Sequence, residues 1–154
     1  MLLSGVFNPK SINIDLQSEE KDEVFEELVE ELVNANPTLD RAAALRAVRE
    51  REAKMSTGIM NGIAVPHGKT DAVNGVRGAI GISRKGIDYD ALDGKPVYLI
   101  FLILSSPDSS ELHLRVLKRL SRLLNNPKFY AAAMEQTCPE ALYDLICKYE
   151  TELL

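Results

Sequence analysis

His67 is one of only two histidines in this chain and the side chain best suited to covalent chemistry. It follows Ile63–Pro66, which predicts a short buried strand ending at the proline, because proline has no N–H to donate to a sheet ladder. We expect Gly68 to allow a sharp turn and a close approach of a ligand to the backbone. His67 should therefore lie at the carboxyl end of a strand, where binding crevices form in open α/β sheets.

The segment around His67 has two other interpretations. Gly62–Thr70 has the glycines, lysine and threonine of a nucleotide-binding phosphate loop, but five residues separate its glycines where that motif has four. We therefore exclude nucleotide binding. The remaining alternative is a histidine that only ends a strand and hydrogen-bonds a neighbour.

The second histidine, His113, lies near the start of a helix expected from about Ser110 to Leu124. It heads the apolar stripe of that helix, so a buried, hydrogen-bonded histidine is one interpretation. The other is an anion site, because the first N–H groups of a helix are unpaired and its dipole is positive there. Both histidines can reach the same edge of the sheet. Two imidazoles beside a bound anion predict a nucleophile and its partner in phosphoryl transfer, with attack by the unprotonated ring nitrogen.

Apolar periodicity predicts an α/β fold, a three-layer α/β/α single domain over residues 1–154 with a central mixed sheet flanked by helices. The continuous apolar run Val97–Leu104 is typical of a central strand covered on both faces. We expect Ser18 and Thr38 to cap the first two helices. The other predicted elements are strands at Ile12–Leu16 and Gly78–Arg84, helices ending near Asn34 and Ala53, helices at 127–135 and 140–150, and a turn at Asp93-Gly94.

Composition excludes several classes of protein. The 23 acidic and 18 basic residues give a net charge of −5, which argues against a nucleic-acid partner. The longest apolar run has eight residues, whereas a membrane span needs roughly 20, so we expect no membrane insertion. The N-terminus lacks a secretory signal, and Cys138 and Cys147 match no zinc or haem spacing. The sequence predicts a cytoplasmic protein with reduced thiols and no metal or other cofactor.

Several segments occur in the order and spacing of a known family. They are Arg51-Glu52-x-x-x-Ser56-Thr57-Gly58, Asn61-Gly62-Ile63-Ala64-Val65-Pro66-His67-Gly68-Lys69, Asp90–Val97 and His113-Leu114. Together they resemble the fructose/mannitol-type IIA domains of the bacterial phosphotransferase system, which include the nitrogen-regulatory IIA proteins. The resemblance covers nearly the whole chain.

The resemblance implies a phosphotransferase that carries a tele-phosphohistidine on His67. It makes His113 the assisting histidine and Arg51 the active-site arginine. The histidine phosphocarrier HPr would be the donor, and a IIB domain or a regulatory target protein would be the acceptor. Thr57 and Asn61 would either line the phosphate pocket or serve loop geometry.

Three roles remain open for such a protein. The absence of a fused IIB, IIC or HPr-like module favours the nitrogen-regulatory type, in which the phosphorylation state is a signal. The alternative is a sugar-specific IIA that passes phosphate to a IIB cysteine. A binding-only regulator is the third, although the joint presence of His67, His113 and Arg51 speaks against it.

Overall fold

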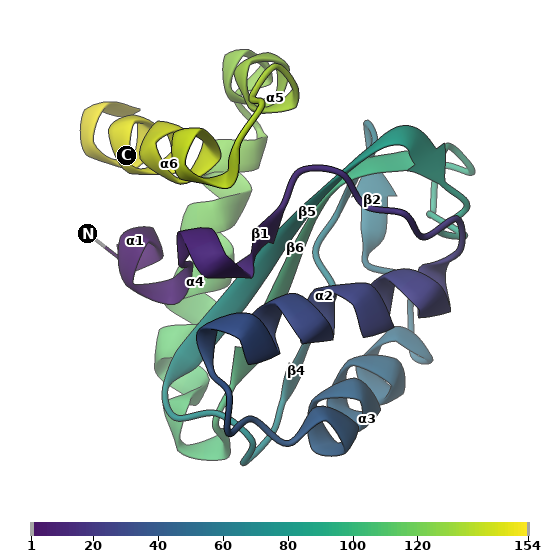
Figure 1. The fold of residues 1–154 in the computed structure, drawn as a ribbon, viewed down its shortest axis with the longest axis vertical. Helices are drawn as coiled ribbons and strands as arrows, with labels where there is room; N and C mark the ends of the chain where they lie inside the picture. The colour runs from purple at the N-terminus through teal and green to yellow at the C-terminus, as the bar shows by residue number, and fades with distance from the viewer. Residues whose placement is uncertain (1, 154) are drawn as a thin grey trace.

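The computed structural model describes residues 2–153, and its centre is a six-stranded mixed sheet (Figure 1). The sheet has the order β1-β5-β6-β3-β2, and β4 pairs separately with β6. The strands are β1 (Ile12–Asn13), β2 (Gly58–Met60), β3 (Ile63–Ala64), β4 (His67–Lys69), β5 (Val76–Ile87) and β6 (Val97–Ser105). The helices are α1 (Leu2–Val6), α2 (Lys21–Ala35), α3 (Arg41–Glu52), α4 (Ser110–Leu124), α5 (Pro127–Met134) and α6 (Pro139–Leu153), with 3-10 turns η1 (Pro9–Ser11) and η2 (Pro107–Ser109).

β6 is the central strand, as its continuous apolar sequence predicts. It runs antiparallel to β5 and parallel to β3 and β4. Its side chains alternate between two cores, because successive residues of a strand point to opposite faces. Ile100, Leu102 and Leu104 belong to one core, and Leu99, Phe101 and Ile103 belong to the other.

Helices cover both faces of the sheet (Figure 1). The first core takes its helical side chains from α2 and α3, and the second takes them from α1, α4, α5 and α6. The predicted three-layer α/β/α arrangement is therefore confirmed. No helix between residues 2 and 153 combines the length and apolar character needed to cross a lipid bilayer.

The predicted N-caps of the first two helices are wrong. α2 is preceded by Glu20, whose N–H donates to the Glu23 carboxylate at 3.2 Å, and the Ser18 hydroxyl instead donates to Glu27 at 2.6 Å. α3 is capped by Asp40, which accepts a hydrogen bond from Ala43 N. In both cases a carboxylate residue lies nearer than the predicted hydroxyl to the first turn, where N–H groups need acceptors.

Elements in the first half of the chain and in β5 differ from the sequence-based expectation. β5 spans 12 residues rather than the predicted seven of Gly78–Arg84, because it pairs with β6 over most of its length. The expected strand at Ile12–Leu16 is only Ile12–Asn13, and the short helix α1 was not expected.

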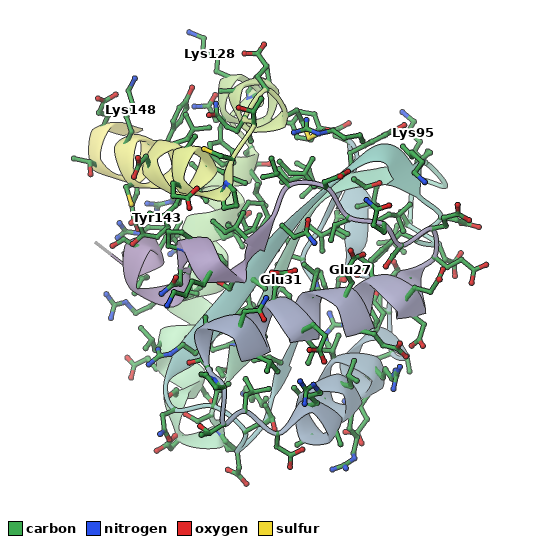
Figure 2. All side chains as sticks on the ribbon, in the orientation of Figure 1. Glu27, Glu31, Lys95, Lys128, Tyr143 and Lys148 are labelled. Carbon is green, nitrogen blue, oxygen red and sulfur yellow. The ribbon has the colours of Figure 1, made fainter. Side chains whose placement is uncertain are left out.

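Side-chain hydrogen bonds hold the N-terminal segment against the helices (Figure 2). On α2, Glu31 accepts from the Asn13 amide at 3.2 Å, and Glu27 accepts from Gln17 N at 3.0 Å. On α6, the Tyr143 hydroxyl donates to the Ser4 carbonyl at 2.7 Å. These contacts give the segment a fixed path although its own strand has only two residues.

Candidate functional site: a histidine pair beside the central strand

His67 follows one short strand, β3, and begins another. Residues His67–Lys69 form β4, which pairs in parallel with β6 and places His67 opposite Ile103. The predicted strand does end before the proline, since β3 stops at Ala64, but the sheet continues beyond Pro66 with β4. Proline removes only a donor, and the Pro66 carbonyl still accepts a hydrogen bond from Ile103 N at 2.9 Å.

Gly68 also has a different role from the one expected. An added Cβ at this position would lie 2.8 Å from the carbonyl oxygen of Ala47 in α3. The glycine is thus needed because α3 packs directly on the β4 backbone. This contact fixes the position of α3, which carries Arg51, relative to His67.

The turn before His67 is a two-residue hairpin that connects β2 and β3. Asn61 and Gly62 both have positive φ, at 59° and 79°. Two such residues suit the right-handed twist of a hairpin, and Asn-Gly is the strongest short-range signal for it. β2 was not among the predicted strands, although this signal is present in the sequence.

A second turn supports this hairpin from outside. Asp93 accepts hydrogen bonds from Asn61 N at 3.2 Å and from Lys95 N at 3.0 Å, and Gly94 has a φ of 72°. The prediction that Asp93 and Gly94 form a turn is confirmed. Asn61 is exposed, and its backbone serves the loop geometry that was one of its two expected roles.

The structure brings the two histidine rings together. Their centroids are 5.5 Å apart and the ring planes are inclined by 52°. His67 Nδ1 lies 2.8 Å from the carbonyl oxygen of Val65. Because a carbonyl oxygen can only accept, Nδ1 carries the proton, and the lone pair of the neutral ring is on Nε2.

Burial keeps His67 neutral. The pKa of this half-buried ring is lowered chiefly by desolvation, which disfavours the charged form. The hydrogen bond to Val65 opposes this shift, the positive charge of Arg51 adds to it, and Glu52 opposes it. At neutral pH the ring is therefore a neutral imidazole, whose unprotonated Nε2 can act as a nucleophile.

His113 is 5% exposed and faces the sheet from the first turn of α4. Its Nδ1 lies 2.6 Å from the hydroxyl oxygen of Ser105, the last residue of β6. Desolvation, followed by the charges of His67 and Lys69, lowers the pKa of His113 to about 4. His113 is thus a buried, hydrogen-bonded histidine beside His67, which confirms the first interpretation of its sequence position, and the anion site at the start of α4 stays a prediction.

Arg51 lies in the last turn of α3. Its Nη1 donates to the Met55 carbonyl at 3.0 Å, and its charge contributes to the lowered pKa of His67. The arginine predicted from the sequence is therefore close enough to the histidine pair to act on it electrostatically.

Thr57 is 4% exposed and belongs to a buried hydrogen-bond network. Its N–H and hydroxyl both donate to the Glu52 carboxylate, at 2.8 and 2.6 Å, and its oxygen lies 2.8 Å from the Tyr89 hydroxyl. Lys21 forms an ion pair with the same carboxylate at 3.2 Å. These contacts give Thr57 a loop-forming role, and its other expected role, in a phosphate pocket, stays a prediction.

Three residues that shape the site were not predicted from the sequence: Glu52, Lys69 and Ser105. Glu52 anchors the loop through Thr57, and Ser105 is hydrogen-bonded to His113. Lys69 Nζ donates to the Ser110 hydroxyl, at the start of α4, at 2.8 Å. Glu52 and Lys69 lie within the matched motifs, so a signal was present for both. Ser105 could be found only once the end of β6 was known to face α4.

A model of the family described as "Phosphoenolpyruvate-dependent sugar phosphotransferase system, EIIA 2" matches residues 5–149. The histidine pair lies within this range, and the chain belongs to that family.

Curated relatives and solved structures show the same similarity. A fructose-specific EIIABC component of Bacillus subtilis is 35% identical over 97% of this chain, which spans 24% of that protein. A fructose-specific EIIA component of Haloferax volcanii is 40% identical over 82% of this chain and 84% of its own length. The crystal structure of the nitrogen regulatory protein IIA-Ntr from Neisseria meningitidis is 29% identical, with a TM-score of 0.87 over 95% of this chain and 99% of the other.

Proposed function

We propose that this protein is a cytoplasmic phosphohistidine carrier that accepts a phosphoryl group from HPr on Nε2 of His67. The observation that carries the proposal is the orientation of His67. Its Nδ1 is bound to the Val65 carbonyl at 2.8 Å, and a second imidazole lies 5.5 Å from its ring. This arrangement supports Nε2 as the attacking atom.

The proposed transfer exchanges one phosphorus–nitrogen bond for another. The Nε2 lone pair of His67 attacks the phosphorus of the donor phosphohistidine, and the donor's P–N bond breaks as the new bond forms. The electron pair of the broken bond returns to the donor nitrogen, so the step needs no water and no redox partner. Such a transfer depends on positioning and charge stabilisation, which two neutral imidazoles and a nearby arginine supply.

The other two residues have complementary roles in this proposal. His113 donates a hydrogen bond to a phosphoryl oxygen, and Arg51 compensates the negative charge of the group. Lys69, beside the start of α4, adds a second positive charge in the same region.

Exposed apolar side chains support a protein as the donor. Met55, Ile59 and Leu114 are 59%, 56% and 67% exposed. The first lies just after the helix of Arg51, the second lies in β2 of the hairpin, and the third is next to His113 in α4. Large apolar side chains in such positions suit a protein partner that docks over the site.

Of the two roles for such a carrier, we propose nitrogen regulation, in which partner proteins respond to the phosphorylation state. The similarity to IIA-Ntr from Neisseria meningitidis over nearly the full length of both chains supports it. Transfer to a IIB cysteine in sugar uptake is the second candidate, which the 40% identity with the fructose-specific EIIA component of Haloferax volcanii favours.

The site assignment is tested by intact mass after incubation with phosphoenolpyruvate, enzyme I and HPr. The wild-type protein should gain one acid-labile phosphoryl group, and His67→Ala should gain none. Acid-labile phosphorylation of His67→Ala would refute the assignment. His113→Gln is the matched control, because it removes the other histidine and should slow labelling without preventing it.

The role is tested by pull-down with the phosphorylated and unphosphorylated forms. A regulatory carrier should bind a partner in only one of the two forms, whereas a binding-only protein would show the same partners in both. Transfer of the phosphoryl group to a cognate IIB, with uptake of a labelled sugar, would establish the sugar-specific role instead.

A further inference from the structure

Ser105 is a fully buried hydroxyl residue in direct contact with His113, one ring of the histidine pair. It ends β6, between Lys69 of β4 and Val76 of β5 in the sheet register. Its Oγ lies 2.6 Å from His113 Nδ1. Because a strand side chain at a sheet centre has little freedom to move, this contact has a defined geometry.

The direction of this hydrogen bond follows from the surroundings of the hydroxyl group. Within residues 2–153, His113 Nδ1 is the only hydrogen-bond partner of Ser105 Oγ. A buried O–H group without an acceptor is costly, so the hydroxyl must donate to Nδ1. The His113 ring is buried beside Lys69 and another imidazole, which keeps it neutral and leaves Nδ1 able to accept.

This direction determines which tautomer His113 adopts. With Nδ1 as acceptor, the ring proton of His113 is on Nε2, whereas in His67 the proton is on Nδ1. The two rings are therefore complementary: His67 has a free lone pair for phosphorus, and His113 has an N–H for a phosphoryl oxygen. The opposite tautomer of His113 would direct a lone pair at that oxygen and repel it.

We infer that Ser105 is a positioning residue that holds His113 as the Nε2–H tautomer, ready to donate to the phosphoryl group on His67. The inference rests on the proposed function for its role in transfer. The tautomer itself is a property of the unphosphorylated protein and is tested separately.

Long-range ¹H–¹⁵N NMR of histidine-labelled protein reads the tautomers directly. The chain has only two histidines, so single His→Gln variants assign both rings. We expect a protonated Nδ1 in His67 and a protonated Nε2 in His113. A protonated Nδ1 in wild-type His113 would overturn the inference, whether or not the protein accepts phosphate.

Substitution then tests whether the serine is responsible. Ser105→Ala should lose the fixed tautomer of His113 and slow phosphoryl acceptance about 3- to 10-fold, the kinetic equivalent of one hydrogen bond. Ser105→Thr keeps the hydroxyl and should retain the wild-type tautomer and rate. The control is Ser83→Ala, which removes another buried strand hydroxyl, bound to Gly86 N at 3.0 Å, and should change neither.

The possible failures are distinguishable. An unchanged His113 tautomer and an unchanged rate in Ser105→Ala would overturn the role of the serine while the carrier function stands. A wild-type protein with the expected tautomers that accepts no phosphoryl group from HPr would overturn the proposed function and, with it, the role of Ser105 in transfer.

Discussion

At the scale of single residues, the chemistry of this protein depends on how two imidazoles are held. His67 is bound through Nδ1 to a backbone carbonyl, and His113 through Nδ1 to a serine hydroxyl. The same ring atom is engaged in both, but one partner can only accept and the other can donate. Two histidines with similar surroundings are thereby given different protonation patterns.

Arg51 should influence both the rate and the pH dependence of phosphoryl acceptance. Its charge helps to lower the pKa of His67, so the neutral nucleophile persists below the ordinary imidazole pKa of about 6.5. In Arg51→Gln we expect the plateau rate to fall by roughly 10² and the acid limb of the rate profile to move to higher pH. Stopped-flow or quenched-flow labelling across pH measures both effects.

The control for this prediction lies on the same helix. Arg46→Gln removes an α3 arginine that does not contribute to the pKa shift of His67, and its profile should match that of the wild type. An acid limb that stays in place in Arg51→Gln would contradict the electrostatic role of Arg51.

His113 should make the stability of the fold depend on pH. Its folded pKa is about 4 against about 6.5 when unfolded, so the unfolded state binds more protons between these values. Stability is therefore lost as pH falls, by about 3 kcal/mol from pH 6.5 to pH 4 for this group alone. Urea unfolding of the wild type and of His113→Gln at several pH values checks this, because the variant should lack that part of the pH dependence of the unfolding free energy. The same pH dependence in both proteins would show that His113 is readily protonated in the folded state.

At the scale of elements, the site lies where the backbone of α3 packs directly against the backbone of β4. Gly68→Ala would place a methyl group 2.8 Å from the Ala47 carbonyl and separate α3 from β4. We expect a loss of about 1–3 kcal/mol of unfolding free energy. Slower phosphoryl acceptance should accompany it, because Arg51 moves with α3. Denaturant unfolding and labelling kinetics measure the two effects.

Gly5→Ala provides a matched comparison for Gly68→Ala. A Cβ at Gly5 in α1 has no atom within 4 Å, so this substitution should leave labelling unchanged and stability the same or slightly higher. A Gly68→Ala protein as stable and as active as Gly5→Ala would show that the close α3–β4 contact does not position the site.

Most elements could be predicted from local patterns, and the exceptions have identifiable physical causes. The apolar run of β6 indicated the sheet centre, and the stripe of α4 placed His113 on a buried face. β4 could not be read from Pro66-His67, because its pairing depends on hydrogen bonds from the distant β6 backbone. The contact of Gly68 with Ala47 is likewise a tertiary feature that no local pattern encodes.

The candidate site was predictable to a similar extent. His67, His113 and Arg51 could be chosen from residue type, spacing and family resemblance, and the structure brings the two rings together. The hydrogen-bond partners that set their protonation could not be chosen. Val65 accepts through its backbone carbonyl, which its residue type does not indicate, and the contact of Ser105 with His113 depends on how α4 packs against the end of β6.

At the scale of the whole molecule, the two ends of the chain are held together away from the site (Figure 1). The buried carboxylate of Glu150 in α6 accepts from Leu3 N at 2.9 Å and forms an ion pair with Arg119 of α4 at 3.5 Å. In Figure 1, α6 lies at the upper left and β4 in the lower half of the molecule. Stability and phosphoryl transfer should therefore be separable.

Glu150→Ala tests this separation. Removing the carboxylate leaves the Leu3 N–H without its partner, and we expect a loss of about 2 kcal/mol with an unchanged rate of phosphoryl acceptance. Glu152→Ala, an exposed acidic residue on the same helix, should change stability by no more than about 0.5 kcal/mol. A large fall in rate in a folded Glu150→Ala protein would mean that the two ends of the molecule are coupled.

The most direct measurement of the central claim is the position of the phosphoryl group on the protein. Phosphorus–nitrogen coupling in NMR spectra of phosphorylated, histidine-labelled protein identifies the bonded ring atom. The account predicts coupling to Nε2 of His67, with its Nδ1 still protonated and His113 unmodified. Coupling to Nδ1 of His67, or to either nitrogen of His113, would contradict it.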